Sequence, residues 1–446
     1  MKKVLKTVTM LCVIVLLLTS NTFSSLAKTD VISSDQAVDL ALFYYFLSAP
    51  EETVSIDSYS ITPLYDKEMS ITYYCVDFFY QGTSKGYVVV GSSLKNILCA
   101  EMSYEGTSKY LSDSENDICT IYYNPFEIFY LDEDTQAYYD QNDNEIMKSD
   151  IDGLMYSGDM QENQEIMQLA SVTSFPEDSR TYINQDPYYY LQELGFTNVQ
   201  CDHYGTRQSV MTAAGAFNKM YTIQIRNGRH AVKTLSSTDF SFSNPGHCAI
   251  TAISNILLYW RYMVMPNIPA SYEQVFTDVF TSAINSGYIR RYASYNSEGE
   301  LIDDGLNFEQ ARDVMMDMVH QYGYDGTILY CEEADWDFLT EQIDSNKVVY
   351  LRFEENNPRV PELEFDYSNH ATIAYGYTVM NANTDTDAYI YQFVKVHDGW
   401  RDDPVAYPRY VCWEMLTQST LDVELVNGVI IEHSIDVGMF SFYPHQ

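Results

Sequence analysis

A cysteine stands at the start of a predicted helix, where its sulfur could act as a nucleophile. Cys248 ends the segment NPGHC at 244–248 and opens a run of apolar residues at helical spacing. Asn244 suits the N-cap of this helix, and Pro245 suits its first turn. The helix dipole and the first-turn N–H groups favour a thiolate over a thiol, and they can hold an oxyanion. The pattern fits an activated nucleophile and a small buried residue at a helix start equally well.

A general base has to come from elsewhere in the chain, because the side chain of His247 points about 100° away from the thiol on a helix. His370 is the better candidate, since it follows a polar turn and opens an apolar strand predicted over 371–377. A second strand is predicted over 389–396, and it leads directly to Asp398. The two strands are close enough in sequence to form a hairpin.

The register of that hairpin can be estimated. If Thr378 pairs with Tyr389, then His370 lies opposite His397 and beside Asp398. A shift of one residue would pair His370 with Asp398 directly, at about 5 Å. A carboxylate beside an imidazole orients a catalytic base and stabilises its charged form. The order cysteine, histidine, aspartate therefore predicts a nucleophile, a base and an orienting acid, with His397 as the weaker candidate base.

Three segments resemble those of a known family. Residues 246–252, followed by Tyr259 and Trp260, resemble the nucleophile segment of streptopain-like cysteine peptidases of the papain superfamily and their neighbouring groups. Residues 369–377 are similar to the histidine strand of these enzymes, and 398–400 take the place of their Asn-x-Trp motif. The resemblance implies Cys248 as nucleophile.

The same resemblance implies the rest of the site and the fold. His370 would be the base, Asp398 would orient it, and peptide hydrolysis would pass through a thioester. The implied fold class is α+β: a papain-like catalytic domain, with a helical half and an antiparallel sheet half, preceded by a small α+β inhibitory prodomain. Trp400 would line the substrate cleft between the two halves.

The oxyanion donor departs from the family pattern. Papain-like enzymes place a glutamine about six residues before the nucleophile, and Phe242 stands there in this chain. Asn244 has suitable amide chemistry, although its predicted capping role competes for the same side chain. Asn244 is therefore the candidate oxyanion donor.

The predicted helices and strands that would position these residues divide the chain into three parts. Residues 1–27 read as a signal peptide, with three lysines before a short apolar core and a small-x-small cleavage pattern. Residues 28–180 form the expected propeptide, with a helix over 33–47, a hairpin over 71–90 and an acidic linker. Residues 181–446 form the expected peptidase domain. Its helices are predicted over 271–286, 307–322 and 336–344, and its sheet begins with a strand over 348–353.

Composition supports an exported, soluble product and limits its partners. Removing the three lysines of the signal, with no acidic residue, takes the formal charge from −38 to −41. Such a chain is repelled by nucleic acid and by anionic membranes. Seven cysteines remain, an odd number without a zinc-type cluster, so no metal or cofactor is expected. The expected partners are protein or peptide substrates and the chain's own prodomain, and no stable membrane anchor is predicted.

Two other classes stay open. The same triad serves secreted transglutaminase-like enzymes and cell-wall amidases, which act on amides other than peptide backbones. A secreted binding protein with an inactive site is the third hypothesis. The leading prediction is a secreted cysteine endopeptidase made as a zymogen.

Overall fold

The computed structural model describes most of the chain outside its N-terminus and several internal segments. The longer described ranges are 30–48, 54–104, 118–125, 127–139, 145–148, 158–172, 183–185, 198–205, 248–290, 305–356, 370–383, 388–397, 409–417 and 434–445. The predicted signal peptide and the predicted boundary at residue 180 lie outside them, so both stay predictions.

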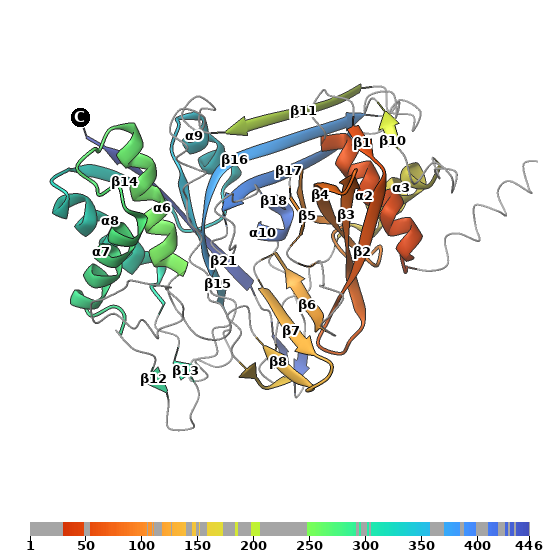
Figure 1. Cartoon of the computed structure of the whole chain (residues 1–446), viewed down its shortest axis with the longest axis horizontal. Coiled ribbons are helices and arrows are strands. Elements are labelled where there is room, and N and C mark those ends of the chain that lie inside the picture. The colour runs from red at the N-terminus through yellow and green to blue at the C-terminus, as the bar shows by residue number, and fades with distance from the viewer. Residues whose placement is uncertain are drawn as a thin grey trace, which may run out of the picture.

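One mixed sheet of 15 strands extends across the molecule (Figure 1). All pairs are antiparallel except one, between β2 and β6. From one edge to the other the order is β14 (Gly326–Cys331), β21 (Ser434–Pro444), β15 (Val349–Asn356), β16 (His370–Asn383), β17 (Ala388–His397), β18 (Arg409–Cys412), β5 (Cys99–Ser103), β4 (Thr83–Gly91), β3 (Ile71–Tyr80), β2 (Ser58–Tyr65), β6 (Ile118–Asn124), β7 (Glu127–Asp132), β8 (Ala137–Tyr139) and β9 (Glu145–Ile146), and β11 (Asn198–Gly205) also pairs with β16.

Short two-stranded sheets complete the described strands. They pair β1 (Val54–Ile56) with β10 (Ile183–Gln185), β12 (Ser294–Tyr295) with β13 (Leu301–Ile302), and β19 (Glu424–Val426) with β20 (Val429–Ile431).

The predicted fold class is wrong. A papain-like arrangement would divide the chain into a helical half, a sheet half and a separate small prodomain, whereas the strands of both chain halves belong to one large mixed sheet. The connection is the pairing of β18 with β5, in which Tyr410 lies opposite Met102 and Val411 opposite Glu101. This contact joins residues about 300 positions apart, and periodicity within a local window carries no information about it.

The individual helices of the C-terminal half agree with their sequence patterns. They are α6 (Cys248–Met263), α7 (Tyr272–Asn285), α8 (Phe308–Gln321) and α9 (Trp336–Asp344), with a short α10 (Trp413–Thr417) after β18. Side-chain caps fix three of the starts: Ser271, Asn307 and Asp335 each accept a hydrogen bond from a first-turn N–H. The helices predicted over 271–286, 307–322 and 336–344 are thereby confirmed.

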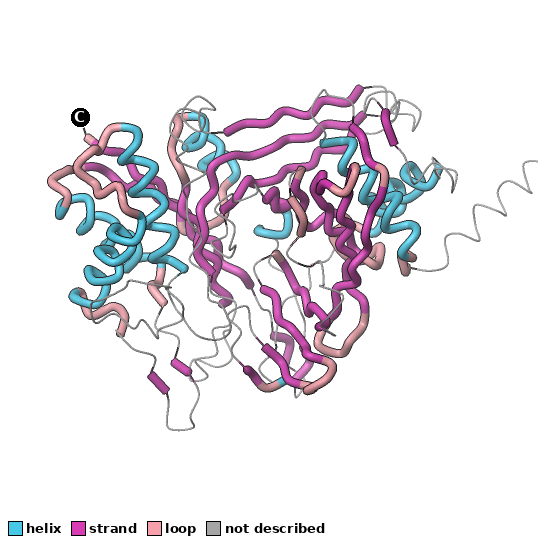
Figure 2. Tube along the Cα trace, in the orientation of Figure 1, coloured by secondary structure: helices cyan, strands magenta, loops and turns pink. Residues whose placement is uncertain are grey.

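The N-terminal half packs one helix against its strands. α2 (Ser34–Ser48) starts with reciprocal bonds between Ser33 and Gln36, the predicted capping box. It lies against β3, β4 and β5, and α3 (Met160–Val172) packs beside it. Twelve residues of α2 are buried, because the helix is covered on several sides. Figure 2 shows most of the helices at the two ends of the molecule, with strands and short helices between them.

Buried tyrosines make the fold sensitive to alkali. Burial raises the pKa of the hydroxyls of Tyr44, Tyr73, Tyr110 and Tyr122 above the ordinary value. In the unfolded chain these groups ionise near pH 10, whereas in the folded chain they stay neutral. Their stabilising contribution is therefore complete below about pH 10 and is lost as the pH rises above it, by about 1.4 kcal/mol per group and pH unit.

We therefore expect cooperative alkaline unfolding above about pH 10.5. Circular dichroism and the absorbance of tyrosinate should be followed together through the titration. Exposed tyrosines ionise first without loss of ellipticity, and the buried group ionises only as ellipticity is lost. Complete tyrosine ionisation at unchanged ellipticity would contradict the burial.

Candidate active site

Cys248 is the first residue of α6, and its side chain is half-buried. The helix that follows is anchored by an almost continuous buried run, which includes Ile250, Ile253 and Trp260. Deep packing of the helix fixes the position of its first turn. Cys248 is partly exposed and lies at the positive end of the helix dipole.

Other described thiols have less suitable surroundings. Cys75, Cys99 and Cys412 are buried, and burial raises the pKa of each, that of Cys412 to about 12. They are neutral at physiological pH and lack the nucleophilic thiolate form. Cys119 is half-buried, but its sulfur lies 3.3 Å from a carboxylate oxygen of Glu133. Cys248 therefore has the most favourable position among them for a nucleophile.

His370 is the first residue of β16, and only 4% of its surface is exposed. It lies opposite Phe353 on β15. Successive strand residues alternate between faces, and Ala371 and Ile373 belong to the core that α6 covers. The His370 side chain therefore lies on the face of the sheet opposite to α6. It stands one residue before Ala371, where β16 starts to pack against that helix. It can approach the thiol only past the end of the strand.

Two contacts fix the direction in which α6 runs. Near its C-terminal end, the Tyr259 hydroxyl donates to the carbonyl of Asn346, 2.5 Å away, just before β15. Trp260 lies against the ring of Phe442, at 6.0 Å between centroids, beside the same end of β15. The helix packs along β15 and β16 (Figure 1). Its N-terminal end, with Cys248, therefore points toward the end where β16 begins with His370.

The predicted hairpin register is wrong. Tyr389 pairs with Ala382 rather than Thr378, and His397 lies opposite Ile373 rather than His370. The strands extend further than predicted, since β16 continues to Asn383 and pairs there with Ala388. The polar residues 384–387, not the apolar stretch before them, connect the strands. The register therefore no longer supports the prediction that His370 lies opposite His397 and beside Asp398.

The remaining predicted site residues lie outside the described part of the chain. Asp398 and Trp400 follow β17 directly, and Asn244 precedes α6 by four positions. Their roles as orienting acid, cleft wall and oxyanion donor stay predictions.

The sequence reasoning missed one charged residue, Arg352. It is 5% exposed on β15, opposite Ala371, and so on the α6-facing side near the start of β16. Residues 348–353 are otherwise apolar or aromatic, and a single cation within such a strand was the available signal. Arg352 thus lies on the sheet face that α6 covers, at the end of the sheet toward which Cys248 points.

Comparison with known proteins identifies no relative: no model of a protein family matches the sequence, and neither does any curated protein. In the described part of the chain, no three His, Cys, Asp or Glu side chains are grouped to hold a metal ion. No helix among these residues is long and apolar enough to cross a membrane.

Proposed function

We propose that this chain is an exported cysteine peptidase, made as a precursor, with Cys248 as nucleophile and His370 as general base. The observation that carries the proposal is the half-buried thiol at the first turn of a helix held in place by the core. The direction of α6, toward the start of β16, supports His370 as the base. The signal-like residues 1–27 support export.

The proposed chemistry is acyl transfer. The Cys248 thiolate attacks a substrate carbonyl, and N–H groups of the first turn of α6 stabilise the oxyanion. Protonated His370 donates its proton to the leaving amine, and a thioester remains on the sulfur. Water then attacks the thioester, with His370 as base, and restores the thiol. The positive end of the α6 dipole favours the thiolate at the start of the cycle.

The substrate class can be tested directly. The exported chain, incubated separately with casein and with soluble muropeptides, should release new amino groups from casein. Activity on muropeptides alone would assign the chain to the cell-wall amidases, and amine incorporation into glutamine side chains would assign it to the transglutaminase-like enzymes. If no substrate is turned over and Cys248 reacts with iodoacetamide at the rate of an ordinary thiol, the chain would be assigned as a binding protein with an inactive site.

The partnership between His370 and the thiol predicts a pH effect. In the wild type, Cys248 should react with iodoacetamide as a thiolate already near pH 6, because an imidazolium nearby stabilises it. His370→Asn should move the midpoint of the rate profile upward toward about 8.5, the value of an ordinary thiol. Mass spectrometry of the alkylated Cys248 peptide measures the rate at each pH.

Thr372→Ala supplies the matched control. Thr372 is 1% exposed and occupies the next position on the same face of β16. Its replacement disturbs the packing of the same strand but removes no base, so the rate profile should stay at the wild-type position. An unchanged profile in His370→Asn would eliminate His370 as the base.

A further inference from the structure

Two thiols from distant parts of the chain lie at the same end of one pair of strands. β5 begins at Cys99, β18 ends at Cys412, and the strands are antiparallel, with Tyr410 opposite Met102. The first residue of one antiparallel strand meets the last residue of its partner. Continuing this register brings Cys412 opposite Ala100, the neighbour of Cys99.

The two side chains also leave the sheet on the same face. Cys99 lies opposite Val90 and Met102 lies opposite Val88, and the register shift between these pairs places an extra residue, Ala100, between them. Because of this bulge, Cys99 shares the face of Met102. Cys412 lies two residues beyond Tyr410 and therefore also shares that face.

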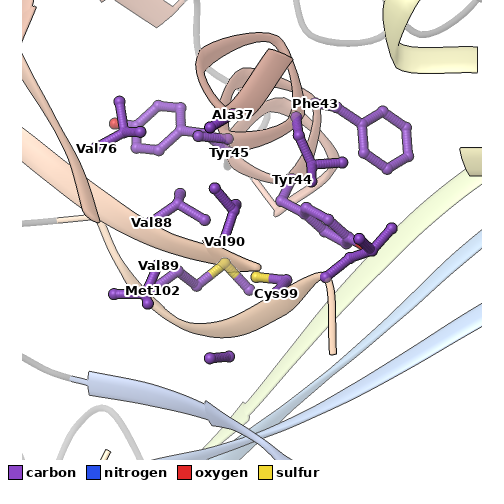
Figure 3. Packing of buried hydrophobic residues seen from close by; sticks show 14 of the residues in the cluster. Ala37, Phe43, Tyr44, Tyr45, Val76, Val88, Val89, Val90, Cys99 and Met102 are labelled. Carbon is purple, nitrogen blue, oxygen red and sulfur yellow. The ribbon is translucent and has the colours of Figure 1, made fainter. Parts of the chain in front are cut away.

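This face is the one that α2 covers. Figure 3 shows Val88 and Val90 between the strands and the helix that carries Tyr44, with Cys99 in the same cluster. Cys99, Cys412 and Tyr44 belong to one buried core. Burial is the largest cause of the raised pKa of the Tyr44 hydroxyl, and Tyr391, Cys99 and Cys412 raise this pKa further.

We propose that Cys99 and Cys412 form a disulfide in the exported protein. With Cys412 opposite Ala100 by continuation of the register, and Cys99 next to Ala100 on the bulged strand and on the same face, the two thiols are neighbours across this pair of strands. Both cysteines are reduced in the structure. The required oxidant is a small disulfide such as oxidised glutathione. One thiolate attacks it and releases one glutathione thiolate, and the second cysteine then attacks the mixed disulfide and releases the other.

The bond should form during folding rather than afterwards. In the folded chain the pKa of Cys99 is raised by burial, and that of Cys412 is raised to about 12. Few thiolates are then present, and no small disulfide reaches the core, so exchange is slow in both directions. Once formed, the bond is protected from reduction for the same reason.

The disulfide would join the N-terminal half covalently to the half that contains α6 and β16. Cleavage of the chain between them would then not release the N-terminal half. This consequence goes beyond the proposed peptidase activity and does not depend on it.

The test is refolding of residues 28–446 with a protease recognition sequence inserted after Met147, whose side chain is 58% exposed. Refolding in a mixture of oxidised and reduced glutathione should lower the mass by two hydrogen atoms and give one linked peptide that contains Cys99 and Cys412. After cleavage at the inserted site, the two fragments should migrate together without reductant and separately with it. Cys99→Ser and Cys412→Ser should each abolish the link.

Cys75→Ser is the matched control. Cys75 is equally buried in the same part of the sheet, but it lies opposite Val89 on the face of Glu101, away from Cys99. Its replacement should leave the link intact. Free Cys99 and Cys412 after oxidative refolding of the wild type, or a bond from either one to another cysteine, would overturn the proposal. Because the readout is on the wild-type chain, misfolding of a serine variant does not obscure it.

Discussion

Replacing Cys248 with alanine is expected to abolish hydrolysis of casein, by at least about 10⁴-fold in kcat/KM. The sulfur is the only atom in the proposed cycle that becomes bonded to the substrate, so no other group can substitute for it. The same variant should remain a full-length precursor when incubated alone, if the chain's own activity cleaves it between its two halves. Release of amino groups and gel migration over time measure the two effects.

The half-buried Cys331 offers the control for this substitution. It ends β14, an edge strand that β21 and β15 separate from β16, and Cys331→Ala should retain wild-type activity. The Cys248→Ala chain should keep its circular dichroism and its melting temperature, since the lost side chain is small and partly exposed. A pure, folded Cys248→Ala protein that still cleaves casein would refute the nucleophile assignment and the proposed mechanism together.

Local structure was the part of this fold that sequence could predict. The start of α2 was marked by a capping box at Ser33 and Gln36, and that cap forms as its pattern requires. The hairpin over 71–90 was marked by β-branched and aromatic residues around a turn, and it forms as β3 and β4. In both cases the determining contacts lie within a few residues, so a local window contains them.

Register and long-range pairing were not predictable in the same way. Strand 389–396 was placed closely, but the apolar residues Val379 and Met380 gave no sign that β16 would continue past them. The predicted pairing was wrong by four positions at Tyr389 and, because of a bulge, by three at His397, so His370 does not pair as predicted. The alternation of apolar and polar residues defines the two faces of a strand. It does not fix the partner of each residue, because a register shifted by an even number of residues keeps the same faces.

The pairing of β5 with β18 illustrates the limit most clearly. Arg409 follows a proline and precedes a short apolar run, a context in which a surface cation is the ordinary expectation. In the structure its side chain is 1% exposed, and its partner Glu101 is completely buried. Only the three-dimensional pairing of two distant strands explains why a cation is buried at this position.

Breaking this buried ion pair should be the most destabilising single change in the sheet. The Arg409 guanidinium contacts the Glu101 carboxylate, donates to the carbonyl of Pro125 at 3.0 Å, and lies 3.5 Å from the Tyr110 hydroxyl. Arg409→Met leaves the Glu101 carboxylate buried without its counter-charge. Glu101→Leu leaves the Arg409 guanidinium buried without its counter-charge. Each variant should lose about 3–5 kcal/mol in the free energy of unfolding, measured by urea titration.

The double variant separates the ion pair from simple packing. A buried ion pair often contributes little more than well-packed apolar residues of similar volume, because desolvation offsets the attraction. Arg409→Met with Glu101→Leu should therefore recover most of the stability that either single change removes. All chains should be refolded and titrated in reducing buffer, so that a bond between Cys99 and Cys412 never forms and does not contribute. Single variants that lose less than about 1 kcal/mol would mean that water reaches the pair, and that β5 and β18 separate more readily than their burial implies.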